Sequence, residues 1–416
     1  MTFGNRAILL FLTLPLAFAQ ARAIPDPAAL RDDPTIKAAF AAIVRNEPEM
    51  LNEEARICEI PAPPFHEEKR GLELKRLFEQ LGLTNVHIDA VGNVIGTRAG
   101  EKPRPNLVLA AHLDTVFPEG TDVKVTRTGS VMKGPGIGDD CRGLVVVLGT
   151  IKALNEGKVK TPGTITFVAN VGEEGLGDLR GAKELFGNSL KGQIDAFISV
   201  DGLGTGITNV GVGSYRYRVT FKGPGGHSYG AFGMANPIQA MGRAMAKIDQ
   251  LEVPAKPKTT FNVGRVGGGT SVNAIPFDAW MEVDMRSADV ESLKALNEKF
   301  KNALNEAVAE ENKRWNNKGA VSVSPEMVGL RPAGHTEESA PIVQTALGVS
   351  KALGLNIRLG EGSTDSNVPM NLNIPAVTIG GGGSGSGAHS LNETYDSTDS
   401  WKGTQRALLL AVSLVQ

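Results

Sequence analysis

Short, continuous apolar runs alternate with a helical stretch in the parts of the chain that flank its middle third. Gly143–Glu156 has the length and periodicity of a buried helix. Four runs are bounded by Gly, Pro or polar residues and are typical of strands buried on both faces: Asn106–Ala111, Thr164–Ala169, Ala196–Val200 and Ala376–Ile379. Strands that alternate with helices predict a doubly wound α/β sheet, covered by helices on both faces.

The pattern changes near Ser214, where polar and apolar residues begin to alternate as in a strand with one wet face. The following expected elements are, in order, a strand at Tyr215–Phe221, an amphipathic helix at Pro237–Leu251, strands at Thr259–Val266 and Ala279–Met285, a charged helix at Val290–Asn312 and a strand near Ala320–Ser324. This βαββαβ order predicts a ferredoxin-like α+β domain inserted into the larger one. We expect a catalytic domain at 24–213 and 328–416 and an inserted lid at 214–327.

The first 23 residues carry an early Arg6, an apolar run and small-residue cleavage sites at Ala19, Ala21 and Ala23. This pattern is typical of a secretory signal peptide and predicts an exported protein, periplasmic or secreted. An uncleaved N-terminal anchor is the alternative. No later segment approaches the roughly 20 apolar residues of a spanning helix, so no stable membrane anchor is expected after cleavage.

Composition adds two exclusions. The 416 residues include 43 Lys plus Arg and 45 Asp plus Glu, so a net charge of −2 gives no reason to expect nucleic acid as a partner. The two cysteines exclude a disulfide-built scaffold and a cysteine-built zinc ribbon. Cys58 and Cys141 could form one disulfide or remain two buried thiols, and the sequence leaves both open.

Metal-ligating residue types collect where the predicted strands end. The residues are His112, Asp139, Glu174, Asp201 and His389, with Asp114 and Glu173 beside them. Ligands of open α/β sheets bind beyond the carboxyl ends of the strands. One catalytic zinc needs three protein ligands, so these five suit two metals if one carboxylate bridges.

The neighbouring residues have roles that complement such a centre. Glu173 and Glu174 are adjacent, so their side chains diverge, and one can bind metal while the other takes a proton from water. Asp114 lies two residues after His112, on the same side of an extended chain, where it can fix the imidazole tautomer.

The motifs AHLDTV, GPGIGDDCRG, GEEG, VDG, GGHS and GAHSLNE resemble the co-catalytic zinc exopeptidases. That family includes aminoacylases, glutamate carboxypeptidases, succinyl-diaminopimelate desuccinylases and tripeptide aminopeptidases. The resemblance extends from about Ala55 to the C-terminus and includes the lid. Cys141 departs from the Lys or Met that many relatives carry after the acidic pair.

The resemblance implies specific roles. His112 and Asp201 would hold one zinc, Glu174 and His389 the other, and Asp139 would bridge them. Glu173 would be the general base and Asp114 would orient His112. In the lid, His227 would contact the scissile carbonyl oxygen, often across a homodimer interface, and Asn273 and Arg286 would hold the free carboxylate of the substrate. Two Zn²⁺ per chain are expected, with Co²⁺ or Mn²⁺ as other possible occupants.

Three other readings compete. Ser228, Asp365 and His389 follow the order of an α/β-hydrolase triad, but the helix after the serine begins only near Pro237. A nucleotide-binding loop at 202–206 lacks the G-x-G-x-x-G spacing. A catalytically inactive relative would not be expected to keep the complete ligand set with Glu173.

The sequence thus predicts an exported metallopeptidase that hydrolyses an amide bond next to a free carboxylate through a metal-bridging hydroxide. Small peptides or N-acyl amino acids are the expected substrates. A carboxypeptidase is favoured, and an N-acyl-amino-acid deacylase or a tripeptide aminopeptidase on the same scaffold is the alternative. A homodimer through the lid is expected.

Overall fold

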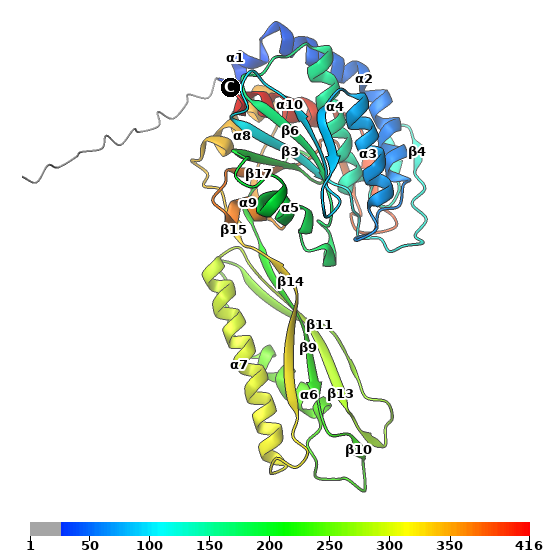
Figure 1. The fold of residues 1–416 in the computed structure, drawn as a ribbon, viewed down its shortest axis with the longest axis vertical. Coiled ribbons are helices and arrows are strands. Elements are labelled where there is room, and N and C mark those ends of the chain that lie inside the picture. The colour runs from blue at the N-terminus through cyan, green and yellow to red at the C-terminus, as the bar shows by residue number, and fades with distance from the viewer. Residues whose placement is uncertain (1–25) are drawn as a thin grey trace, which may run out of the picture.

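The computed structural model describes residues 26–416, so the predicted signal peptide lies outside the described residues. The chain forms two lobes, a larger one with helices on both faces of a sheet and a narrow one that projects from it (Figure 1). No helix among residues 26–416 is long and apolar enough to cross a membrane.

The larger lobe is built on a mixed nine-stranded sheet. Its strands, from one edge to the other, are β1 (Thr84–Ile88), β2 (Val94–Arg98), β6 (Thr164–Asn170), β3 (Asn106–His112), β7 (Ala196–Val200), β17 (Ala376–Ile379), β8 (Ile207–Gly211) and β15 (Gly334–His335), with β16 (Leu359–Gly362) also paired to β8. The four central strands β6, β3, β7 and β17 are parallel neighbours. They are the four strands that the apolar runs predict, and they are almost wholly buried.

Helices cover both faces of this sheet, as a doubly wound fold requires. The helices of the lobe are α1 (Pro27–Arg31), α2 (Pro34–Cys58), α3 (Glu68–Gln80), α4 (Arg142–Glu156), α5 (Arg180–Glu184), α8 (Pro341–Ala352), α9 (Asn367–Asn371) and α10 (Trp401–Leu414). Because α4 packs between the sheet, α2 and α10, it is apolar around most of its circumference. Side chains of α5 and α9 belong to a second core on the opposite face.

The projecting lobe, residues 213–331, is the lid. It contains an antiparallel sheet and two helices in the order β9 (Gly213–Lys222), α6 (Pro237–Asp249), β11 (Thr259–Gly268), β13 (Asp278–Ser287), α7 (Val290–Arg314) and β14 (Ser322–Arg331). The strand order β11-β13-β9-β14 is that of a ferredoxin-like sheet. Tyr217, Val219 and Phe221 face the helices in a separate core, which explains the alternating pattern of β9. The predicted fold class is confirmed.

The last lid strand is longer than the sequence predicts. It extends to Arg331 and passes through Pro325 and Gly329, which ordinarily argue against a strand. Because β14 is an edge strand, only one of its sides pairs with a neighbour, and proline is tolerated at such edges. A register shift occurs between Met327 and Gly329. The predicted boundary at 327 therefore falls inside β14.

Two smaller sheets complete the fold. In the larger lobe, β4 (Thr126–Thr128), β5 (Val131–Lys133), β19 (Thr394–Asp396) and β18 (Ser384–Ser386) form one antiparallel sheet. In the lid, β10 (Gly226–His227) pairs with β12 (Ala274–Ile275) at the end remote from the main sheet (Figure 1).

Cys58 and Cys141 form a disulfide, which settles the choice left open by the sequence. It joins the last residue of α2 to the turn before α4 across a sequence separation of 83 residues. We expect the double substitution Cys58→Ser, Cys141→Ser to lower the free energy of unfolding by about 4 kcal/mol. Without the cross-link the unfolded chain has more conformational entropy, and for a loop of this length that entropy stabilises the unfolded state by about this amount. Urea unfolding of the oxidised wild type and the variant tests this, and equal unfolding midpoints would contradict it.

Candidate metal centre

Five segments meet at the carboxyl edge of the main sheet. Because β6, β3 and β7 are parallel neighbours, their carboxyl ends lie side by side. The residues brought there are His112 at the end of β3, Glu173 and Glu174 after β6, Asp201 after β7, Asp139 in the turn before α4, and His389 between β18 and β19. The sequence predicts this convergence from three strand ends, from the segment before the buried helix and from the glycine-rich loop before His389.

The donor atoms form three groups, of which two share one carboxylate and the third consists of His112, Glu173 and Glu174. Of the two that share a carboxylate, His112, Asp139 and Asp201 make one, and Asp139, Glu174 and His389 make the other, with the atoms of each group within 4.8 Å of one another. Asp139 lies between the two imidazoles, since its Oδ1 is 3.0 Å from His112 Nε2 and its Oδ2 is 3.1 Å from His389 Nε2. Each oxygen of Asp139 thus faces a different group.

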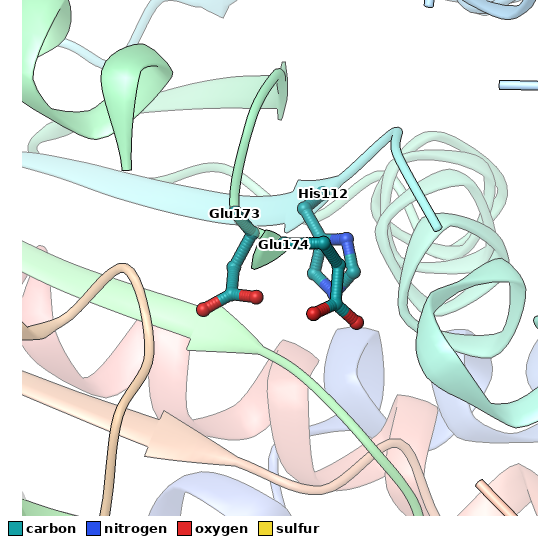
Figure 2. Close-up of side chains that lie close together, drawn as sticks. All are labelled: His112, Glu173 and Glu174. Atoms are coloured by element: carbon teal, nitrogen blue, oxygen red, sulfur yellow. The ribbon is translucent and has the colours of Figure 1, made fainter. Parts of the chain in front are cut away.

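Glu173 and Glu174 diverge from adjacent positions. Figure 2 shows the two carboxylates directed to different sides, with that of Glu174 beside the ring of His112. One oxygen of each carboxylate nevertheless lies within 4.8 Å of a ring nitrogen of His112. Glu174 Oε1 lies 2.9 Å from His389 Nε2. Glu173 instead places Oε1 3.1 Å from Nη1 of Arg331, and both side chains are buried. The two glutamates therefore have different partners.

Asp114 contacts His112 chiefly through its backbone oxygen, whereas the sequence analysis expects its carboxylate to orient the imidazole. The ring Nδ1 of His112 lies 2.9 Å from the backbone oxygen of Asp114, and the Asp114 carboxylate is farther away, at 3.6 Å. That carboxylate accepts hydrogen bonds from the backbone N–H groups of Glu173 and Glu174, at 3.0 and 2.8 Å. Asp114 thus fixes His112 chiefly through its main chain and fixes the two glutamates through its side chain.

Two neighbouring residues that the sequence analysis did not assign support the edge. Asp140 is fully buried and accepts hydrogen bonds from the backbone N–H groups of His112 and Gly143, which holds the end of β3 against the start of α4. Arg331, at the end of β14, donates to the side chain and to the backbone oxygen of Glu173. The only local sequence feature at Arg331 is Pro332, which follows it and indicates that the strand ends there. That feature does not predict the contact with Glu173.

The electrostatics of the cluster suit a bound cation. Burial and the charges of Glu173 and Asp139 raise the pKa of Glu174 to about 8, and burial and Asp139 raise the pKa of Asp201 well above its ordinary value. A divalent cation would reverse these shifts, because its charge favours the ionised carboxylates. The donors are carboxylate oxygens and imidazole nitrogens, which zinc accepts. The residues present therefore fit a metal centre.

The three lid residues expected at the site do not lie among the metal-ligating residues of this chain. His227 is on β10 and Asn273 immediately precedes β12, at the tip of the lid remote from the metal edge (Figure 1). Arg286 is on β13, where its Nε donates to Asp284 at 2.7 Å. His227 and Asn273 are thus far from Arg286, and both are far from the metal-ligating residues of the same chain.

The competing readings have no assembled site in the described part of the chain. Ser228 lies at the lid tip next to His227, whereas Asp365 is fully buried in the larger lobe, where it accepts from Asn170 at 2.6 Å. The glycine-rich segment 202–206 leads into the strand β8, so no helix begins there to bind a phosphate.

Sequence comparisons identify the relatives of this chain. The model of "Peptidase family M20/M25/M40" matches residues 108–412. An uncharacterised protein, YqjE of Bacillus subtilis, is 27% identical over 80% of this chain and 90% of its own length. Carboxypeptidase G2 of a Pseudomonas strain is 29% identical over 54% of this chain and 56% of its own length.

Solved structures share the fold. Aminopeptidase PepT of Bacillus cereus superposes with a TM-score of 0.71 at 22% identity, over 88% of this chain and 98% of its own. The YXEP protein of Bacillus subtilis, described as a dinuclear metal-binding peptidase of family M20, gives a TM-score of 0.67 at 18% identity, over 90% and 99%. The chain therefore belongs to the peptidase family M20/M25/M40 and is a metal-dependent hydrolase that acts on amide bonds.

Proposed function

We propose that this chain is an exported di-zinc exopeptidase of the carboxypeptidase type, which cleaves an amide bond next to a free carboxylate. The observation that carries the proposal is the pair of donor groups that share Asp139. His112 and Asp201 would hold one Zn²⁺, Glu174 and His389 the other, and Asp139 would bridge them. These residues provide an imidazole and a terminal carboxylate for each metal.

The chain's own residues then have distinct tasks. Two bound metal ions would supply Lewis acidity toward the amide carbonyl and lower the pKa of water. Glu173 is the general base, which takes a proton from the attacking water and passes it to the leaving amine. Arg331 holds Glu173 in place from the end of the lid. His227 would stabilise the negative charge that develops on the scissile carbonyl oxygen.

A cavity beside Arg331 supports recognition of a free carboxylate. The cavity has a volume of ≈ 250 Å³, and its walls include Arg286, Lys258 and Ser363 together with the carboxylate residue Glu361. Ser363 Oγ lies 3.1 Å from Arg331 Nη1, so the cavity is connected through these two side chains to Glu173. Because Arg286 uses Nε for Asp284, the terminal nitrogens of its fork are available for a bidentate contact with a carboxylate.

We expect Arg286→Ala to lower kcat/KM for substrates with a free carboxylate by on the order of 10–100-fold, as loss of a charge-assisted contact does. The amidated analogue of the same substrate should lose little. The measurement is kcat/KM on matched pairs of free and amidated dipeptides. Arg265→Ala is the control, since Arg265 is an exposed arginine on the same lid sheet. An equal loss on both members of a pair would contradict the proposed role.

The alternative substrates use the same machinery. Among the relatives, an N-acetylcysteine deacetylase of Bacillus subtilis is 23% identical over 60% of this chain and 68% of its own length. A panel of dipeptides, tripeptides and N-acyl amino acids separates the possibilities. The proposal predicts that substrates blocked at the N-terminus are cleaved and that substrates blocked at the C-terminus are not. The reverse result would favour an aminopeptidase.

The tip of the lid supports a homodimer. Large apolar side chains are exposed there, close in sequence to His227 and Asn273: Tyr229, Phe232, Val272 and Phe277. Exposed apolar groups of this kind mark interaction surfaces. In its own chain, the strand β10 that carries His227 is remote from the main sheet (Figure 1). We propose a dimer in which the tip of one chain contacts the metal-ligating residues of the other, so that His227 acts on the partner's site.

We expect light scattering at assay concentration to give the mass of about two chains for the wild type, because the covered tip is apolar. Val272→Asp should shift the mass toward one chain and lower kcat, because a charge would then be buried in the interface. Val44→Asp is the control, since Val44 is exposed on α2 in the other lobe. A monomeric wild type with full activity would contradict the dimer.

Export is supported by the disulfide between Cys58 and Cys141. Disulfides form and persist in oxidising compartments, which include the periplasm and the extracellular space. Edman sequencing of the mature protein from culture fluid or periplasm tests this, with a start directly after Ala19, Ala21 or Ala23 as the expected result. A chain found only in the cytoplasm with its first residues intact would contradict it.

A further inference from the structure

A buried carboxylate ties together two loops of the metal edge. Glu393, four residues after His389, is 2% exposed. Its Oε2 accepts a hydrogen bond from the backbone N–H of Gly136 at 2.9 Å, and its Oε1 accepts from Gly138 at 2.8 Å and from Asp139 at 3.0 Å. One side chain therefore accepts hydrogen bonds from three backbone N–H groups within the four residues 136–139.

The fit around this carboxylate is close. A Cβ atom at Gly138 would lie 3.2 Å from Glu393 Oε1 and 2.9 Å from Leu203 Cδ1, so a larger residue here would have to displace the carboxylate or the leucine side chain. The backbone oxygen of Glu393 also accepts from Gly134 N, at 3.2 Å. The segment 134–139 thus rests on Glu393 along most of its length.

The two donor groups depend on this contact to different degrees. His112 ends the buried strand β3 and Asp201 directly follows the buried strand β7, so the main sheet fixes both. The side chain of His389, in contrast, is 54% exposed, and its backbone has a positive φ of 64° in the loop between β18 and β19. No member of the group Asp139–Glu174–His389 directly adjoins a strand of the main sheet, because Glu174 lies four residues after the end of β6.

We infer that Glu393 is a positioning residue that sets the geometry of the group Asp139–Glu174–His389, and that this group binds its metal more weakly than the group His112–Asp139–Asp201. The inference rests on the proposed function, since it requires both groups to bind metal. Glu393 provides no metal ligand, but it lies on the His389 loop and holds the Asp139 turn, so it fixes Asp139 relative to His389. The neighbouring Asp140 holds the same turn to the backbone of His112 without Glu393, so loss of Glu393 affects the position of Asp139 relative to His389 more than relative to His112. Outer partners of this kind tune metal affinity.

The isosteric substitution Glu393→Gln tests the inference. An amide has one acceptor oxygen and one NH₂ group. The NH₂ group would face a backbone N–H, and because both are donors, the hydrogen bond at that end would be lost. Metal-free full-length chain is titrated with Zn²⁺ in competition with a chromophoric chelator. We expect two affinities for the wild type, and in the variant a second equivalent that binds 10–100-fold more weakly while the first changes by less than about threefold.

Ser390→Ala is the matched control. Its hydroxyl donates to Gly387 O at 2.7 Å and accepts from Asn392 N at 3.3 Å, both within the same loop. We expect this variant to titrate like the wild type. Equal weakening of zinc binding at both equivalents in Glu393→Gln would overturn the inference, because Glu393 would then act on the fold in general. The same loss of affinity in Ser390→Ala would also overturn it, because any change in the loop would then have this effect.

Two further results separate the possible failures. If Glu393→Gln does not fold, Glu393→Asp replaces it, and the retracted carboxylate should still weaken the second equivalent selectively. A wild type that binds fewer than two equivalents would contradict the proposed two-metal function itself. A wild type with two equivalents and an unchanged Glu393→Gln titration would contradict this inference alone.

Discussion

Glu173→Gln should lower kcat by on the order of 10²–10⁴-fold and leave the metal content unchanged. The amide has nearly the shape of the carboxylate but cannot take a proton from water. The proposed ligands stay in place, because Glu173 belongs to neither donor group that shares Asp139. The measurements are kcat on the best substrate of the panel and metal content by elemental analysis.

The control for this substitution is Glu119→Gln, which changes an exposed glutamate outside the site. We expect it to have the kcat of the wild type. Near-normal turnover in Glu173→Gln would remove Glu173 from the chemical step. Loss of metal together with activity would instead show that Glu173 acts as a ligand, which its third grouping with His112 and Glu174 makes geometrically feasible.

Asp139→Ala should weaken both metal sites, because Asp139 is the one residue common to the two donor groups. Loss of an outer partner already costs 10–100-fold in metal affinity, so we expect the loss of this ligand to cost on the order of 10²-fold or more at each site. Activity should fall below detection at metal concentrations that saturate the wild type.

His389→Ala is the comparison for Asp139→Ala. His389 belongs to one donor group, so this variant should lose the second equivalent and keep the first. Titration of both metal-free variants with Zn²⁺ distinguishes the two patterns. If Asp139→Ala retained one equivalent at the affinity of the wild type, Asp139 would not bridge.

The central strands of the fold are predictable from the sequence because they are buried on both faces and read as unbroken apolar runs. The helix α2 has no such signal, since its 25 residues include Pro48 and mix buried apolar residues with charged ones. The end of β14 is equally obscure, because its edge position, which makes Pro325 acceptable, exists only in the assembled sheet.

In the candidate metal centre, too, some features can be predicted from local sequence and others depend on the assembled fold. Residues at strand ends, such as His112 and Asp201, can be placed from local sequence because parallel strands end at a common edge. The partners of these residues depend on contacts between distant segments. Arg331 is 158 residues from Glu173, and Glu393 is 254 residues from Asp139. The position of His227 at the lid tip likewise follows from the shape of the inserted domain.

The most direct test of the two-metal proposal is elemental analysis of the purified mature chain, with amide hydrolysis assayed before and after chelation and after return of Zn²⁺. We predict about two equivalents of zinc per chain, activity lost on chelation and activity restored by the metal. A metal-free chain that still hydrolyses the substrate, and that a serine-directed reagent inactivates, would contradict the proposal.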